Sequence, residues 1–198
     1  MNFKYTKINQ DEASSSKLKG FIIDFFDVCV KSLIAILILI TFVFRFCEVI
    51  GDSMNNTLYD GESLIISNFF YNPSEGDIVV FHDTVNLNEP VVKRVIATGN
   101  RWVKIDYDNC LLYVSDDDFF DASDLVDESQ YVYLSGGSYN MSGSQITYVP
   151  DGYLFLMGDN RNNSTDSRSP SIGLVDKRTV LGRVIFRISP IQRFGLVK

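Results

Sequence analysis

Hydrophobic residues are most concentrated in one run near the N-terminus, and this run has no polar face at helical spacing. Its uninterrupted core, residues 32–44, would extend only about 20 Å as a helix, short of a hydrocarbon layer of roughly 30 Å. Lys31 and Arg45 border this core, and their long apolar stems let the charged groups reach the lipid headgroups. Residues 28–47, which include both, would extend about 30 Å, so the pattern predicts one transmembrane helix there.

Two other interpretations of this run are a cleaved signal peptide and a buried core helix. No small-x-small cleavage site follows Phe44, and a core helix would carry the polar face that this run lacks. Basic residues lie before the run, whereas the first basic residue after Arg45 is Lys93. By the positive-inside rule, residues 1–27 form a loosely ordered cytoplasmic tail, and residues 48–198 form an extracytoplasmic domain.

Beyond residue 48 the pattern changes to short runs of β-branched and aromatic residues, separated by Gly, Asn, Asp or Pro. Runs of this length and composition are typical of β-strands. We expect strands within residues 62–70, 76–82, 90–97, 101–105, 110–115, 130–134, 145–149, 152–158 and 179–188. The sequence therefore predicts a mainly β domain after the transmembrane helix.

One part of this domain has a different composition. Residues 106–128 contain nine acidic residues and no basic one, and a Gly/Ser-rich stretch follows at residues 135–144. Such a composition is well solvated and packs poorly. We therefore interpret residues 105–149 as a small, variable, acidic insertion, an exposed excursion from the core sheet.

Charge and cysteine usage exclude some classes of function. The formal net charge is −7, of which residues 1–47 carry +2 and residues 48–198 carry −9. An acidic main domain argues against nucleic acid as a partner. The three cysteines, Cys29, Cys47 and Cys110, have the spacing neither of a disulfide framework nor of a metal site, so no metal is expected.

A Gly-Asp-Ser-Met turn follows the apolar run, and its Ser53 lies only eight residues beyond Arg45. This spacing keeps the serine near the membrane surface. The one histidine, His82, ends a predicted strand, where a surface role is commoner than catalysis, so a Ser-His-Asp site is disfavoured. A lysine can act as the base instead when burial lowers its pKa. On its local sequence alone, Lys93 is still better explained as a strand residue that faces solvent.

Three motifs together change this interpretation: GDSMNNTL around Ser53, VVKRVI around Lys93, and GDNRNNSTDSR at residues 158–168. In this order, after a single span, they resemble the type I signal peptidases, especially the short forms of Gram-positive bacteria. The resemblance covers nearly everything from Val49 to the C-terminus except the acidic excursion, and the third motif is the most specific. It implies a signal-peptidase-like antiparallel β-sheet catalytic domain that uses no cofactor.

The resemblance implies a role for each matching residue. Ser53 is expected to be the nucleophile and Lys93 the general base, while Ser164 is expected to hydrogen-bond the lysine amine and orient it. The logic is that of a triad, with a nucleophile, a base and a third group that fixes the base. Further matching residues that brace the site are Asp159, Arg161, Asp166 and Arg168.

The same resemblance implies an oxyanion hole and a substrate pocket. The backbone N–H of Ser53 would form part of the hole, in a turn that Gly51 lets approach closely. Some relatives carry a serine at the position of Gly51, so here a second donor must come from elsewhere. Residues that match the shallow apolar pockets for the small side chains before the cleaved bond are Met54, Leu58, Val91 and Val92.

The chain departs from the family pattern at a few positions. Asn56 replaces a proline of the serine motif, which should loosen that turn. After the lysine, the sequence IATGN carries Ala97 and Asn100 where the family commonly has Gly and Asp. None of these changes removes a catalytic group, and together they indicate a diverged or specialised member.

The predicted function is that of a serine endopeptidase, anchored in a bacterial cell membrane, that removes N-terminal signal peptides from exported preproteins. Its expected partners are those signal peptides, the lipid bilayer and the secretion machinery. One alternative is a non-proteolytic homologue that acts as an assembly factor for surface structures such as pili. Another is a self-cleaving repressor, which the membrane span and the absence of a DNA-binding segment disfavour.

Overall fold

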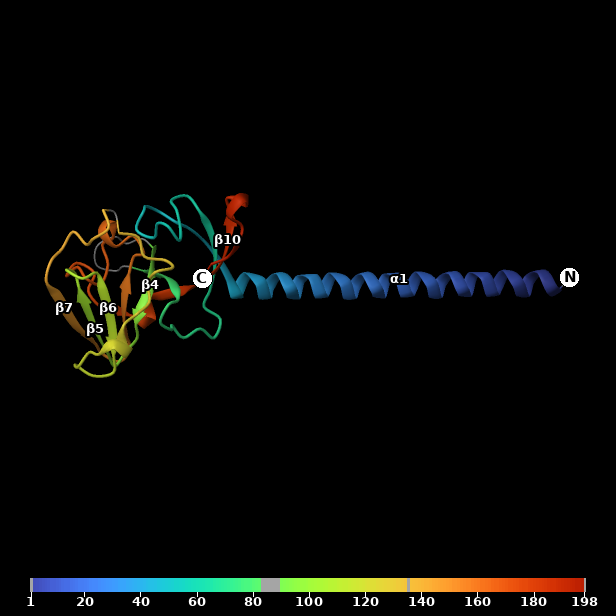
Figure 1. Ribbon diagram of the computed structural model, residues 1–198. Helices are drawn as coiled ribbons and strands as arrows, with labels where there is room; N and C mark the ends of the chain where they lie inside the picture. Colours follow the sequence, from blue (N-terminus) through green and yellow to red (C-terminus); the bar gives the residue numbers. More distant parts are fainter. Residues whose placement is uncertain (1, 83–89, 135, 198) are drawn as a thin grey trace. The chain divides into compact units, whose positions relative to one another are not determined.

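The computed structural model describes residues 2–82, 90–134 and 136–197, and the chain divides into two compact units after Val43. The first unit is α1 (Asn2–Val43), a single helix of 42 residues (Figure 1). Its part from Lys19 to Val43 is long and apolar enough to cross a membrane, since 25 helical residues extend about 37 Å. A helix is the form in which a single segment bonds all its backbone groups internally, as lipid requires.

Both ends of α1 differ from the sequence prediction. The helix begins within the segment expected to be a loose tail, and it ends at Val43 rather than Cys47. Residues Phe44–Glu48 form strand β1, which pairs antiparallel with β2 (Ser63–Ser67) and sets Cys47 opposite Leu64. The predicted helix end is therefore wrong, because strand pairing in the second unit takes up residues that are apolar enough for either structure.

The second unit contains two antiparallel sheets (Figure 1). The large sheet has the strand order β1-β2-β10-β3-β4-β8-β9, with β11 paired to β10, and the small sheet has the order β6-β5-β7. The remaining strands are β3 (Ile78–His82), β4 (Pro90–Ala97), β5 (Arg101–Asp106), β6 (Leu111–Ser115), β7 (Ser144–Val149), β8 (Tyr153–Met157), β9 (Val175–Asp176), β10 (Val180–Ser189) and β11 (Gly195–Leu196). Short 3₁₀ turns are η1 (Ala122–Asp124), η2 (Arg161–Asn163), η3 (Lys177–Thr179) and η4 (Ile191–Arg193). The predicted mainly β, antiparallel architecture is confirmed.

Strand β4 lies where the apolar clusters of the second unit meet. Val92 packs in a cluster with Leu64, Val95 packs in a second with Phe81, and Ile96 packs in a third with residues of the small sheet. A strand packed on several sides has little freedom to shift, because interiors are close-packed. The two charged residues in the middle of β4 are therefore presented from a fixed backbone.

The acidic excursion is better packed than its composition suggested. Ile105, Leu112 and Val149 are almost fully buried in the cluster under the small sheet. Tyr139, from the Gly/Ser-rich stretch, is also buried there, so the expectation of poor packing is wrong. The strand predicted at residues 130–134 is absent as well, whereas the eight other predicted strands correspond to β2 through β8 and β10.

Candidate active site

Ser53 lies in the connection between β1 and β2. Two backbone hydrogen bonds close the base of this connection, from Val49 N to Glu62 O (2.8 Å) and from Gly61 N to Val49 O (2.9 Å). Within it, Leu58 N donates to the Met54 carbonyl over 2.9 Å, and both of these side chains are buried. The serine turn, residues 51–62, is thus anchored from inside and leaves Ser53 half-buried at its surface.

Lys93 reaches Ser53 from the middle of β4. Its Nζ donates to Ser53 Oγ over 2.7 Å and to the Val92 carbonyl over 3.1 Å, and the residue is only 3% exposed. Burial is the main reason that the pKa of Lys93 falls to about 8. The nearby charges partly offset one another, since Asp166 and Asp159 raise this pKa while Arg168 lowers it.

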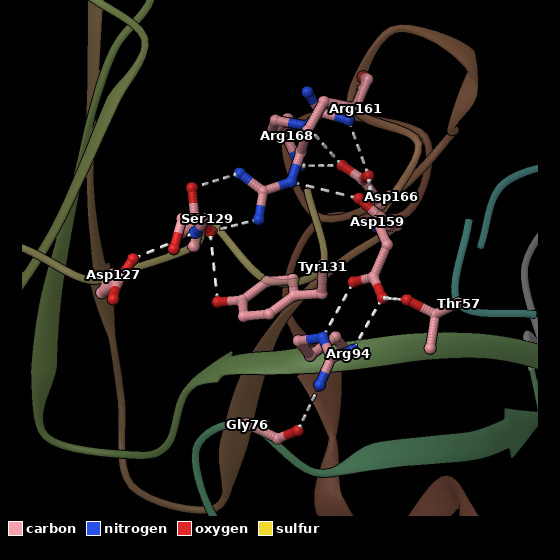
Figure 2. Close-up of polar contacts among 12 residues, drawn as sticks. Thr57, Gly76, Arg94, Asp127, Ser129, Tyr131, Asp159, Arg161, Asp166 and Arg168 are labelled. Atoms are coloured by element: carbon pink, nitrogen blue, oxygen red, sulfur yellow. Dashed lines mark hydrogen bonds and ion pairs between the residues drawn. The ribbon is translucent and has the colours of Figure 1, made fainter. Parts of the chain in front are cut away.

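The next residue on β4, Arg94, is held in a different way (Figure 2). Its Nε and Nη2 donate to the two carboxylate oxygens of Asp159 over 2.8 and 2.7 Å. Thr57 Oγ1 donates to the same carboxylate over 2.5 Å, and Arg94 Nη1 donates to the Gly76 carbonyl over 2.8 Å. Asp159 is fully buried, so this paired charge fastens the serine turn to β4 through Thr57.

Asp166 is the centre of a second buried ion pair. Arg168 donates to it through Nε and Nη2, each over 2.8 Å, while Gly158 N and Ser164 Oγ donate over 3.0 and 2.7 Å. Burial by itself would raise the pKa of Asp166, but the charge and hydrogen bonds of Arg168, with those of Gly158 and Ser164, lower it. Asp166 is therefore a fixed anion.

Gly158 brings the loop of residues 158–168, which carries Asp159 and Asp166, against the serine turn. A side chain at this position would overlap with the carbonyl oxygen of Ser53 and with the hydroxyl of Ser164. Two hydrogen bonds of Asn160 join the same surfaces, from its N to Ser53 O and from its Nδ2 to Asp52 O, each over 3.0 Å. The glycine of the third motif is required because the two backbones touch.

Arg161 is buried like Arg94, and its partner comes from the excursion. It donates to both carboxylate oxygens of Glu128, with Nη1 to Oε2 measuring 2.7 Å, and Nη1 also donates to the Tyr139 hydroxyl over 2.9 Å. Its Nε donates to the Gly158 carbonyl over 3.1 Å. Sequence reasoning missed Glu128 and Tyr139, because no local pattern links them to Arg161.

A buried carboxylate at the other end of the serine turn was also missed. Glu62 is 2% exposed and accepts from Arg187 over 2.9 Å and from Arg193 over 2.5 Å. Both arginines also donate to the Thr57 carbonyl, over 3.0 and 3.2 Å. The C-terminal part of the chain therefore holds the serine turn through Glu62 and the Thr57 carbonyl.

The structure brings most of the predicted site residues together, with two differences in detail. The Ser164 hydroxyl donates to Asp166, and among the described residues it makes no hydrogen bond to Lys93. The four predicted pocket residues divide between clusters: Met54, Leu58 and Val92 pack together, whereas Val91 packs with residues of the neighbouring cluster.

Other candidate chemistry lies outside this site. His82 ends β3 opposite Pro90 and makes no hydrogen bond to Ser53 in the described part of the chain. Cys29, Cys47 and Cys110 are free thiols. Among the described residues, no group of three or more His, Cys, Asp or Glu side chains is placed to hold a metal ion.

Comparison with known proteins adds sequence matches over most of the chain. Residues 22–189 match the family described as signal peptidase, peptidase S26. A probable signal peptidase I-1 from Synechocystis is 35% identical over 155 residues, covering 73% of this chain and 71% of that protein. Signal peptidase IB from Staphylococcus aureus is 31% identical over 156 residues, covering 73% of this chain and 77% of that protein.

A solved structure is also similar. The crystal structure of a signal peptidase I from Enterococcus faecalis V583 aligns with a TM-score of 0.42 and 25% sequence identity. The alignment covers 57% of this chain and 97% of that one.

Proposed function

The chain belongs to the signal peptidase family S26, and we propose that it removes N-terminal signal peptides from exported preproteins with Ser53 as nucleophile and Lys93 as general base. The observation that carries this proposal is the 2.7 Å contact between Lys93 Nζ and Ser53 Oγ, made by a lysine whose pKa burial lowers to about 8. A base must lie within hydrogen-bond reach of the proton it accepts.

In the proposed reaction the neutral amine of Lys93 accepts the hydroxyl proton of Ser53 while Oγ attacks the scissile carbonyl. The resulting ammonium then gives its proton to the leaving amine, and an acyl-enzyme remains on Ser53. Lys93, neutral again, takes a proton from the water that hydrolyses this ester and gives it to Ser53 Oγ as the acyl group leaves, which restores both groups. One residue therefore serves as base and acid in turn, which requires a pKa close to the working pH.

The tetrahedral intermediate carries a negative charge on the former carbonyl oxygen, and we propose the Ser53 N–H as one donor to it. Gly51 has a positive φ of +81°, and its N–H already donates to Asp60 over 2.7 Å. That N–H is therefore unsuited to be the second donor. Gly51 instead contributes the backbone conformation that starts the serine turn.

For the substrate pocket we propose that the half-buried Val91 contacts the small side chains before the cleaved bond directly. Met54, Leu58 and Val92 are buried together and would form the floor beneath them. Such a packed floor leaves room for small side chains and excludes large ones, because overpacking a rigid apolar site is costly.

We further propose that the chain crosses a bacterial cell membrane once through Lys19–Val43, with the N-terminus in the cytoplasm and residues 44–198 outside. The distribution of basic residues supports this orientation, since none follows Arg45 before Lys93. The chain leaves the helix at Val43 and enters β1 at Phe44, so the membrane anchor continues directly into the sheet that carries Ser53.

Cleavage of a soluble peptide with an Ala-x-Ala site by the detergent-solubilised full chain tests the proposal. We expect Ser53→Ala and Lys93→Ala each to abolish cleavage while the fold is retained, and His82→Ala to cleave like the wild type. Activity in either folded dyad variant would contradict the assigned mechanism. A wild-type chain that binds such peptides without cleaving them would favour the non-proteolytic assembly factor.

A further inference from the structure

We propose that residues 128–134 of the acidic excursion form a strap that positions the loop of residues 158–168 for catalysis, with Glu128 as the positioning residue. The inference rests on the proposed function, because it assigns these residues a part in the same reaction. Its basis is a set of backbone and side-chain contacts between two segments that are about 30 residues apart in sequence.

The backbone of the strap pairs with the loop of residues 158–168 on both sides of Asn160. Tyr133 N donates to the Asp159 carbonyl over 2.8 Å, and Arg161 N donates to the Tyr133 carbonyl over 3.1 Å. These two bonds form an isolated parallel bridge between Tyr133 and Asn160. Because Asn160 also donates to the carbonyls of Ser53 and Asp52, the strap is connected to the serine turn through one residue.

The side chains of the strap neutralise one buried cation, Arg161, and cover another, Arg94. The Arg161 side chain is 0% exposed, and among the described residues Glu128 is the carboxylate in contact with it. The centroid of the Tyr131 ring lies 4.0 Å from Cζ of Arg94 (Figure 2). Arg94 is the arginine that pairs with Asp159. A buried charge that loses its partner is strongly destabilising, so Arg161 needs Glu128 to remain where it is.

Arg161 passes this constraint to the reacting groups. Its Nε donates to the Gly158 carbonyl, and its own carbonyl accepts from Arg168 Nη2 over 2.7 Å. Gly158 touches Ser53 and Ser164, so a displaced Arg161 would move the surface against which the nucleophile rests.

Glu128→Gln is the decisive variant, because it removes the charge and keeps the size of the side chain. In the full-length chain we expect kcat for a soluble Ala-x-Ala peptide to fall by about 10- to 100-fold with KM little changed, since misplacing reacting groups by even 1 Å can cost this much. Asp118→Asn is the matched control, an exposed acid of the same excursion, and should leave both constants unchanged.

A double-variant cycle tests whether Glu128 acts through Arg161. We expect Arg161→Met to lose kcat as Glu128→Gln does, and the double variant to be no worse than Arg161→Met alone. Hydrogen exchange of residues 156–168, measured in a Ser53→Ala background, should be faster in Glu128→Gln than in Asp118→Asn. If Glu128→Gln does not fold, Glu128→Asp, which keeps the charge on a shorter side chain, should show an intermediate kcat.

Wild-type kcat in folded Glu128→Gln, or in Glu128→Asp when that is the variant used, would overturn the strap proposal. Additive losses in the double variant would overturn it too, because they would show that Glu128 acts independently of Arg161. Absence of Ser53-dependent cleavage in the wild-type chain is a different result, which would overturn the proposed function and the inference together.

Discussion

Lys93 and Arg94 are neighbours on β4 and each is 3% exposed. The surroundings of Arg94 stabilise its positive charge, whereas those of Lys93 disfavour the charged form. Arg94 faces a fully buried carboxylate whose two oxygens accept from its Nε and Nη2. Lys93 faces a serine hydroxyl and a backbone carbonyl. The first arrangement fixes a permanent cation, and the second makes the charged form of the lysine costly.

The counter-ions of the site follow the same division. Each of three arginines whose side chains are at most 7% exposed has its own carboxylate: Arg94 has Asp159, Arg161 has Glu128, and Arg168 has Asp166. Among the described residues, none of these three carboxylates forms a hydrogen bond or ion pair with Lys93. The comparison teaches that burial alone does not make a reactive lysine, and that the pairing of the groups around it matters as much.

The largest effect on the cleavage rate should come from replacing Lys93 with arginine, the residue type of its neighbour Arg94. In Lys93→Arg the base is replaced by a cation that stays protonated, so we expect the cleavage rate to fall by about 10²–10⁴-fold, the usual contribution of general base catalysis. The rate with an Ala-x-Ala peptide measures this loss. A folded Lys93→Arg enzyme with nearly full activity would mean that the proton goes to another group.

Removing the counter-ion of Arg94 should mainly lower the stability of the fold. Asp159→Asn leaves Arg94 buried without its counter-ion, and we expect the free energy of unfolding to fall by about 3–5 kcal/mol. Urea denaturation of residues 44–198 within the full chain measures this change. Asp118→Asn controls for the loss of one acidic charge, and an equally small effect for both variants would contradict the account.

Replacing Lys93 should change the free energy of unfolding in the opposite direction. Holding Lys93 protonated where its pKa is about 8 costs about 3 kcal/mol relative to the unfolded chain, and Lys93→Met avoids this cost. We expect the variant to be more stable than the wild type by up to this amount at pH 7. Its advantage should shrink as pH rises from 8 to about 10.5, where the unfolded lysine also becomes neutral. A variant less stable than the wild type at pH 7 would contradict this.

The smallest predicted effect concerns Ser164. Its hydroxyl donates to Asp166, so Ser164→Ala removes one charge-assisted hydrogen bond next to the nucleophile. We expect the cleavage rate to fall by about tenfold, in keeping with about 1.5 kcal/mol for such a bond. Ser142→Ala, at an exposed position of the excursion, is the control. A loss as large as that of Lys93→Arg would show that Ser164 acts on the lysine directly.

The sequence predicted most strands because their apolar runs are short and end at turn-forming residues. It missed β1, since residues 44–47 continue the apolar run, and only pairing with β2 decides that they leave the helix. It also placed a strand at residues 130–134, where Tyr and Val alternate. In the structure this segment lies against the irregular loop around Asn160, which offers a single bridge rather than a ladder.

Some residues of the candidate site could be predicted from the sequence and others could not. Ser53, Lys93 and the third motif could be identified because each motif is contiguous in sequence. The partners Glu128 and Glu62 could not, since they lie 33 residues from Arg161 and 125 residues from Arg187, and acidic composition says only that a segment is well solvated. Burial and pairing of charges depend on the folded chain, so they become visible only in the structure.

The most direct test of the central claim is a titration of Lys93 itself. The ε-methylene carbon of Lys93, labelled with ¹³C and assigned by comparison with Lys93→Met, can be followed by NMR in the full chain across the pH range. The account predicts a midpoint near pH 8, because the lysine is buried and, in the part of the chain that the structure describes, no carboxylate is in contact with it. A midpoint at or above about 10.4, the value of an ordinary lysine, would contradict it.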